Sequence, residues 1–153
     1  MSFFISAGVR KINVLQPNGN ISVKIDLPEL LIHFSTTSTI RLFVVIKGIL
    51  YVPALKNINT DGTLCIGNCP IPVYDKKTPL EIKESILSTI FDGVFSDDLN
   101  PTGFTMKEMK EIYTKTKDQK INISKNLFLS RCVKPVISLN DYIKKMNKHL
   151  NKE

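Results

Sequence analysis

Histidine and cysteine are scarce in this sequence, and their scarcity limits the chemistry available to it. Among 153 residues there are two histidines, His33 and His149, and three cysteines. A closed zinc site needs four ligands with paired spacing, whereas Cys65 and Cys69 supply two, and the histidines lie in distant halves of the chain. We therefore expect no metal site and no cofactor, and we expect neither histidine to act as the base of a protease-like mechanism.

A long apolar run is also missing. The longest apolar stretch, residues 40–55, is interrupted by Arg41, Lys47, Gly48 and Pro53, whereas a bilayer-spanning helix needs roughly 20 predominantly apolar residues in a row. At the N-terminus no basic segment precedes the first apolar residues, and basic residues follow too soon for a signal peptide. These absences predict a cytoplasmic protein with no membrane segment.

The odd number of cysteines indicates reduced thiols rather than a disulfide framework, because no export signal is present. Cys65 is the candidate reactive residue, and Cys69 and Cys132 are expected to be structural. A metal or redox protein that uses Cys65 and Cys69 is a further alternative, and it predicts bound zinc or iron after purification.

Acidic residues are too few to balance the basic ones in the last third of the chain. Residues 1–106 contain nine Lys/Arg and nine Asp/Glu, whereas residues 107–153 contain twelve and five, so the whole net charge of +7 lies there. No interleaved aromatics and no helix-turn-helix pattern accompany it. This basic C-terminal region indicates a solvated lysine-rich surface or, alternatively, a weak contact with nucleic acid or an acidic protein face.

The length and the 42% hydrophobic content suit one core and not two, so residues 1–153 are expected to form a single domain. Alternating apolar and polar residues and turn signals predict an N-terminal antiparallel meander of about four strands. The expected elements are strands at residues 11–15, 21–25, 39–46 and 49–52, a short helix at 27–34, and tight links at Pro17-Asn18-Gly19-Asn20 and Lys47-Gly48.

The second half of the chain is expected to be mainly helical. The segment Thr78-Pro79-Leu80-Glu81 is a capping box with proline at the first helical position, and its helix is expected to end at Gly93. Residues 106–117 also show helical spacing, whereas residues 121–128 are ambiguous. A final helix after Ser138 is expected to carry an apolar stripe of Leu139, Tyr142, Ile143 and Met146. The predicted fold class is therefore α+β, with a basic helical C-terminal region.

Residues 54–74, between the strands and the first long helix, have the Asn, Gly, Pro and Cys content of a loop. A loop held by a sheet can expose a side chain and keep it in position, and Cys65 lies in this loop. A cysteine thiolate forms a thioester that an amine can later attack, and an amide such as Asn57 can donate a hydrogen bond to the oxyanion of the intermediate. The alternatives are a buried cysteine and a turn asparagine.

Asn57 and Cys65 stand eight positions apart, with Ile58-Asn59, Gly62 and Leu64 between them. This pattern resembles the ubiquitin-conjugating enzymes, in which the asparagine of a His-Pro-Asn tripeptide lies eight residues before the catalytic cysteine. The family pattern also contains Asn-Ile-Asn, then glycine, then an aliphatic residue just before the cysteine.

Three features differ from the eukaryotic members of that family. Leu55-Lys56 stands in place of His-Pro, the chain has no tryptophan, and no amphipathic helix precedes the first strand. Together with Leu64-Cys65-Ile66-Gly67-Asn68, they are more similar to the bacterial branch, in particular to the B component of the PRTRC plasmid and mobile-element systems. The resemblance spans roughly residues 49–104.

The resemblance implies a UBC-like fold and an enzyme that carries a ubiquitin-like modifier as a thioester on Cys65 and transfers it to an amine, while Asn57 steadies the loop or the oxyanion. It implies three partners: a ubiquitin-like protein, a ThiF-like adenylating activator and a JAB-type isopeptidase. Asp98 resembles the acidic residue that orients an incoming lysine, and its alternative is an ordinary turn residue. A second hypothesis is an inactive UBC fold that binds a ubiquitin-like partner or DNA and assists plasmid maintenance.

Overall fold

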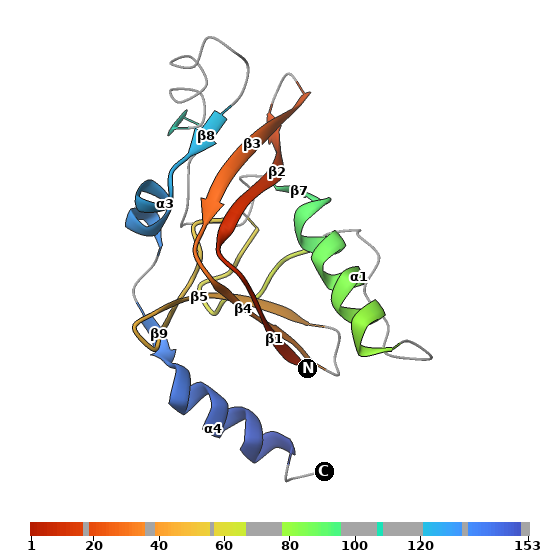
Figure 1. Ribbon diagram of the computed structural model, residues 1–153, viewed down its shortest axis with the longest axis vertical. Coiled ribbons are helices and arrows are strands. Elements are labelled where there is room, and N and C mark those ends of the chain that lie inside the picture. The colour runs from red at the N-terminus through yellow and green to blue at the C-terminus, as the bar shows by residue number, and fades with distance from the viewer. Residues whose placement is uncertain are drawn as a thin grey trace.

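The strands form two sheets (Figure 1). The structure is a computed structural model that describes residues 1–16, 19–35, 39–55, 57–66, 78–95, 107–108, 121–132 and 135–150. Sheet A is antiparallel throughout and contains, in spatial order, β1 (Ser2–Ile5), β4 (Leu30–Phe34), β5 (Ile40–Ile46), β6 (Ile49–Tyr51) and β9 (Pro135–Ser138). Sheet B contains, in order, β7 (Val94–Phe95), β2 (Gly8–Gln16), β3 (Gly19–Leu27) and β8 (Ile121–Ile123).

The centre of sheet B is the predicted hairpin of β2 and β3, which pair in antiparallel register from Gly8 with Leu27 to Gln16 with Gly19. The two outer strands join it in parallel. One face of the hairpin is buried through Ile12, Val14, Val23 and Ile25. These side chains join one hydrophobic cluster with residues of sheet A, namely Leu30, Ile32, Phe34, Ile40, Leu42 and Val44. The main core is therefore built by both sheets.

Helix α1 (Pro79–Phe91) confirms the predicted capping box. The Glu81 N–H donates to Thr78 Oγ1 at 3.3 Å, and the Thr78 N–H donates to Glu81 Oε2 at 2.6 Å. Both bonds satisfy N–H groups that lack intrahelical partners. The helix buries Ile82, Ile86 and Ile90 in the main core. It lies on one side of the β2–β3 hairpin, and α3 (Lys125–Arg131) lies on the other (Figure 1).

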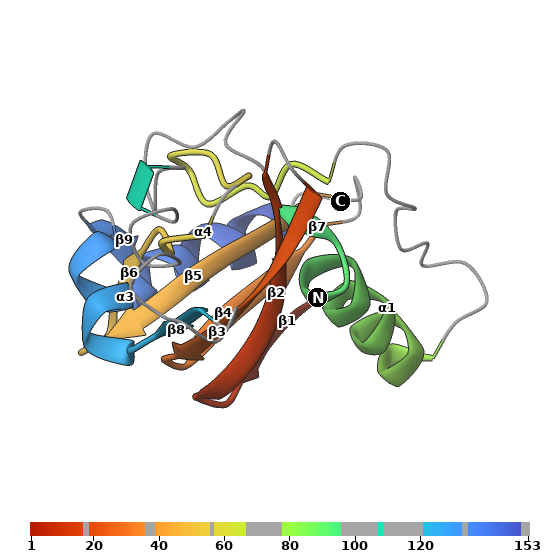
Figure 2. The ribbon, with the colours of Figure 1, turned by 90° about the horizontal axis from the view of Figure 1, so that it is seen from above.

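Helix α4 (Leu139–Leu150) covers the face of sheet A that points away from the main core (Figure 2). Ser138 caps it as predicted, since its Oγ accepts the Asp141 N–H at 3.1 Å. Tyr142 is buried in a second cluster with Leu31, Phe43 and Leu50. The predicted stripe is wrong at Ile143, which is 47% exposed, because one residue turns the direction of a helical side chain by about 100°.

The short helix predicted at residues 27–34 is wrong, because Leu27 ends strand β3 and residues 30–34 form strand β4. All of Leu30, Leu31, Ile32 and Phe34 are buried and His33 is half-buried, because β4 lies between β1 and β5 with one face on each cluster. A short apolar run that is buried on both faces has no alternation, so its periodicity does not separate strand from helix.

The α+β fold class is confirmed, but four strands are too few and the C-terminal region is not only helical. Residues 121–128 divide into β8 and the start of α3, and β9 precedes α4. Of the helix predicted at 106–117, Lys107 and Glu108 are helical and the rest lies outside the described residues. Within the described ranges, no helix is long and apolar enough to cross a membrane.

Candidate functional site

Residues 57–65 fold back on themselves as a short hairpin. Its backbone contacts are an antiparallel bridge between Ile58 and Leu64 and hydrogen bonds from the N–H groups of Asn59, Gly62 and Cys65 to the carbonyl oxygens of Thr63, Asn59 and Asn57, at 2.8, 2.9 and 2.7 Å. The last of these bonds places Cys65 directly beside Asn57. The spacing of eight residues therefore corresponds to the span of one hairpin, and we call residues 57–65 the cysteine hairpin.

The cysteine hairpin is held against the first half of β5. The Leu42 N–H donates to the Gly62 carbonyl oxygen at 2.9 Å, and the Leu64 N–H donates to the Ile40 carbonyl oxygen at 2.8 Å. Strand β6 pairs with the second half of β5, so the hairpin continues the same edge of that strand. Cys65 follows the last of these bonded positions, and sheet A thereby fixes where its backbone lies.

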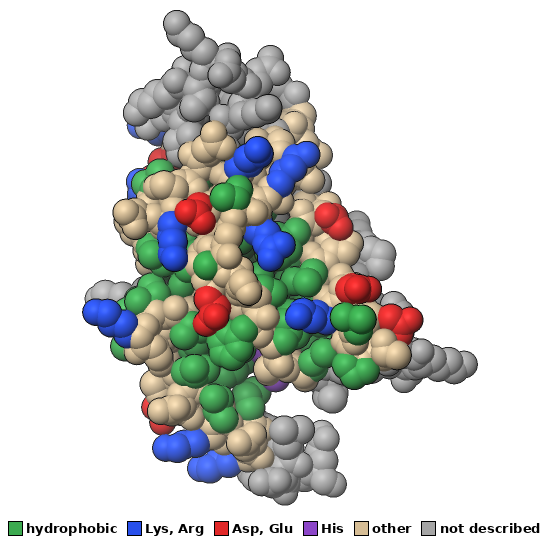
Figure 3. Space-filling model, in the orientation of Figure 1, with side chains coloured by type: hydrophobic (Ala, Val, Ile, Leu, Met, Phe, Trp, Pro, Cys, Tyr) green, Lys and Arg blue, Asp and Glu red, His purple; other side chains and the backbone are tan. Residues whose placement is uncertain are grey.

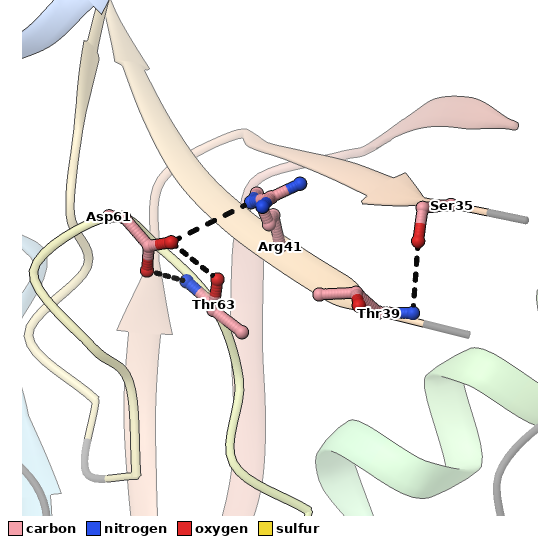
Figure 4. Close-up of polar contacts among 5 residues, drawn as sticks. All are labelled: Ser35, Thr39, Arg41, Asp61 and Thr63. Atoms are coloured by element: carbon pink, nitrogen blue, oxygen red, sulfur yellow. Dashed lines mark hydrogen bonds and ion pairs between the residues drawn. The ribbon is translucent and has the colours of Figure 1, made fainter. Parts of the chain in front are cut away.

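Side chains strengthen the turn of the cysteine hairpin (Figure 4). Asp61 accepts the Thr63 N–H at 3.0 Å and the Thr63 hydroxyl at 2.8 Å, and Arg41 Nε lies 3.9 Å from its Oδ2. Burial alone would raise the pKa of Asp61, but the bonds from Thr63 and the charge of Arg41 outweigh burial and hold it below its usual value. Beside the hairpin, the Thr39 N–H donates to Ser35 Oγ at 3.0 Å and ties the end of β4 to the start of β5.

The backbone conformation at position 57 favours asparagine. Its φ is 62°, in the left-handed region, and asparagine tolerates that region better than most residues with a side chain. Both Asn57 and Cys65 are half-buried. Among the described residues, Cys65 belongs to neither hydrophobic cluster. This position does not match the alternative of a cysteine buried as a small hydrophobe.

Cys132 has a different environment. It packs against the main core, and its Sγ donates to the Phe128 carbonyl oxygen at 3.5 Å. Burial raises the pKa of its thiol to about 11, although a hydrogen bond from the Ala54 backbone acts in the opposite direction. Because the thiolate is the nucleophile, Cys132 is a poor reactive residue, in line with the structural role predicted for it.

The variant Cys65→Ser/Cys69→Ser, which retains Cys132 as its only cysteine, is expected to react with iodoacetamide at least about tenfold more slowly than free cysteine. A higher pKa reduces the thiolate fraction at mildly alkaline pH, and the greater nucleophilicity of each thiolate offsets only part of this loss. The rate is followed by intact mass. Unfolding in urea should restore the rate of free cysteine, and an equally fast reaction of the folded protein would contradict the buried position.

His33 lies on β4 rather than on a helix, on the face of sheet A that α4 covers. Its Nδ1 lies 2.8 Å from Ser2 Oγ, and its ring meets the Tyr142 ring edge to face at a centroid distance of 5.9 Å. Burial, the N-terminal ammonium group and Arg41 lower the pKa of His33 to about 4. The ring is therefore neutral in the folded protein at neutral pH.

Acidification from about pH 7 to about pH 4 is expected to lower the free energy of unfolding through His33 by about 1–2 kcal/mol, after allowance for solvent screening of this half-buried ring. An unfolded histidine takes up its proton near pH 6.5, whereas folded His33 does so only near pH 4. The contribution of His33 to stability is complete above the pKa that this histidine has in the unfolded chain. It is lost as the pH falls toward the lower pKa that His33 has in the folded protein.

Urea titrations across this pH range test that expectation. The stability difference between the native protein and His33→Gln should shrink as the pH falls. A difference between native protein and His33→Gln that stays constant with pH would contradict the assignment.

The structure brings two of the three predicted site residues together. Asn57 and Cys65 are in backbone contact. The third predicted site residue, Asp98, lies outside the described residues, as does Cys69. Arg41 and its contact with the hairpin turn were not predicted, because Arg41 is twenty positions from Asp61 in the sequence and only strand pairing joins them.

The chemistry open to the site is that of a thiol. Among the described residues, no group of three or more His, Cys, Asp or Glu side chains is arranged to hold a metal ion. No family model, curated protein or solved structure matches the chain. Any functional assignment therefore depends on the cysteine hairpin itself.

Proposed function

We propose that this chain is a bacterial ubiquitin-conjugating-enzyme-like protein with a UBC-like fold, acting in the cytoplasm. It carries a ubiquitin-like modifier as a thioester on Cys65 and transfers it to an amine. The observation that supports this function is the 2.7 Å backbone bond between Cys65 and Asn57, in a hairpin whose residues follow the ubiquitin-conjugating pattern. Half-burial of Cys65 outside both hydrophobic clusters is compatible with a reactive thiol.

The reaction has two acyl transfers. A ThiF-like activator presents the carboxyl terminus of the modifier in activated form, and the Cys65 thiolate attacks the carbonyl carbon. A carbon–sulfur bond forms as the activator's leaving group departs. The amine of an acceptor then attacks the thioester, an amide bond forms, the Cys65 thiolate leaves, and the proton of the amine passes to a base. A JAB-type isopeptidase would hydrolyse this amide bond and release the modifier.

Asn57 and Asp98 have separate parts in this proposal. Asn57 contributes its backbone carbonyl to the position of Cys65, and its side-chain amide would donate to the oxyanion of each tetrahedral intermediate. Asp98 would orient the acceptor amine. Because the cysteine hairpin is held by backbone bonds to β5, its geometry exists before the modifier binds, which reduces the cost of ordering during the reaction.

The test is a charging reaction with a cognate activator, ATP and ubiquitin-like protein, followed on non-reducing gels. We expect an adduct that disappears with thiol reagent. Cys65→Ala should abolish it and Cys65→Ser should abolish its thiol sensitivity, whereas Cys132→Ser, which changes a half-buried cysteine elsewhere, should leave charging intact. A cognate set that charges the Cys65→Ala variant as well as the native protein would overturn the proposal.

A further inference from the structure

The outer face of sheet B carries two exposed lysines, Lys11 and Lys24, beside the half-buried Asn13, Ser22 and Asp26. The hairpin of β2 and β3 buries one face in the main core, so alternate residues point outward. Figure 3 shows basic side chains over the region of β2 and β3, on the side of the molecule that faces the viewer. Among the residues whose side chains the structure describes, the outward ones on β2 and β3 are Val9, Lys11, Asn13, Asn20, Ser22, Lys24 and Asp26, and Asn122 of β8 pairs beside Lys24.

Two lysines of this face stand directly opposite each other. Lys11 and Lys24 are register partners on β2 and β3, and both are exposed. Side chains in such a pair have Cβ atoms about 4.5–5.5 Å apart, and like charges there destabilise the hairpin. Asp26 lies on the same face, but within the described part of the chain it forms no ion pair with either lysine. No direct ion pair within the described fold offsets the repulsion between the two lysines.

We propose that the outer face of sheet B binds the phosphate backbone of nucleic acid. An anionic phosphate placed between Lys11 and Lys24 would replace their repulsion with two attractive contacts. The neutral neighbours Asn13, Ser22 and Asn122 supply N–H and O–H donors of the kind that contact phosphate and sugar oxygens. No aromatic side chain lies among the described outward residues, so the expected contact is with phosphate and sugar rather than by base stacking.

Other anionic partners fit this face less well. The centre of a specific protein interface is typically apolar with a polar rim, whereas here the centre is the lysine pair, and among the described outward residues the exposed apolar one, Val9, lies near the end of β2. A membrane surface is bound by apolar groups that enter the interface together with basic ones. Lys11 and Lys24 against Asp26 leave the described outward residues with a net charge of +1, and positive charge among polar neighbours is typical of surfaces that bind nucleic acid.

Lys24→Glu separates binding from folding, because it should stabilise the protein. It turns a repulsive pair into an attractive one with Lys11, and the midpoint of thermal unfolding is expected to rise by about 1–3 °C. The reciprocal variant Lys11→Glu should behave in the same way. If these variants are at least as stable as the native protein, unfolding cannot be the cause of a loss of nucleic-acid binding.

Binding is measured by fluorescence anisotropy with a labelled duplex DNA of mixed sequence at low salt. Lys24→Glu and Lys11→Glu should each weaken binding by about tenfold and reduce the slope of log affinity against log salt by about 1. Lys144→Glu, an exposed residue of α4, makes the same change of net charge and should weaken binding less than about twofold.

Three results would overturn the proposal. The first is the absence of DNA binding by the native protein at low salt. The second is an equal loss of affinity in Lys144→Glu and Lys24→Glu, because binding would then follow net charge or the basic C-terminal region rather than sheet B. The third is binding to vesicles of anionic phospholipid without binding to DNA, because the surface would then be a membrane contact.

Discussion

Gly62→Ala is expected to lower the free energy of unfolding by about 2–4 kcal/mol. Gly62 has a φ of 84°, which favours glycine, and a Cβ added there would lie 2.5 Å from Cε1 and 2.9 Å from Cζ of Phe43 and 3.0 Å from the Leu42 carbonyl oxygen. The Phe43 ring is fully buried against Tyr142, so it has little room to move. Backbone strain and overpacking therefore add.

Gly48→Ala is the matched control for that variant. Gly48 also has a positive φ, 75°, but nothing lies within 4 Å of an added Cβ. Gly48→Ala should therefore lower the free energy of unfolding only through backbone strain, by about 1 kcal/mol. Both variants are compared by urea unfolding. An equal loss of stability in Gly62→Ala and Gly48→Ala would show that the hairpin turn is not packed against Phe43 as described.

Asn57→Gly is expected to reduce the rate of transfer from the thioester by about 10²-fold and to cost less stability than Asn57→Ala. Glycine adopts the φ of 62° without strain, so the cysteine hairpin keeps its backbone conformation when the side-chain amide is removed. This prediction rests on the proposed function. It separates the two reasons for an asparagine at this position, one conformational and one catalytic.

Single-turnover discharge to an amine measures that rate, and urea unfolding measures stability. Asn57→Ala is the informative partner, because alanine both lacks the amide and strains the backbone at positive φ, and it should therefore lose rate and stability together. If Asn57→Gly transfers at the native rate, the amide has no part in catalysis and Asn57 is a turn residue.

Elements with strong local signals could be predicted from the sequence. The capping box of α1 and the serine cap of α4 are side-chain contacts across three residues, so neighbouring residues alone specify them. The link at Lys47 and Gly48 was likewise predictable, since both adopt positive φ, 48° and 75°, as tight hairpin turns require.

Elements that depend on distant partners could not be predicted. Strands β7, β8 and β9 have two to four residues, too few for a periodic pattern, and each exists because it pairs with a strand far away in the sequence. The same reason applies to β4, whose burial on both faces is set by α4 and the main core.

The candidate site was predictable in part for a related reason. The spacing of Asn57 and Cys65 is local, and one hairpin turn accounts for it. The attachment of that turn to β5 depends on Arg41 and Phe43, which contact it through strand pairing and packing across the sheet. Neither contact has a signal in the cysteine loop itself.

The central claim, that Cys65 carries the modifier, is tested most directly by locating the thioester in the charged protein. Trypsin should release residues 57–76 as one peptide that contains both Cys65 and Cys69, so fragment ions between the two cysteines identify the attachment point. We expect the modifier's carboxyl-terminal remnant on Cys65 and its loss after thiol treatment. A remnant on Cys69, or a native protein that stays uncharged with an active cognate set, would contradict the account.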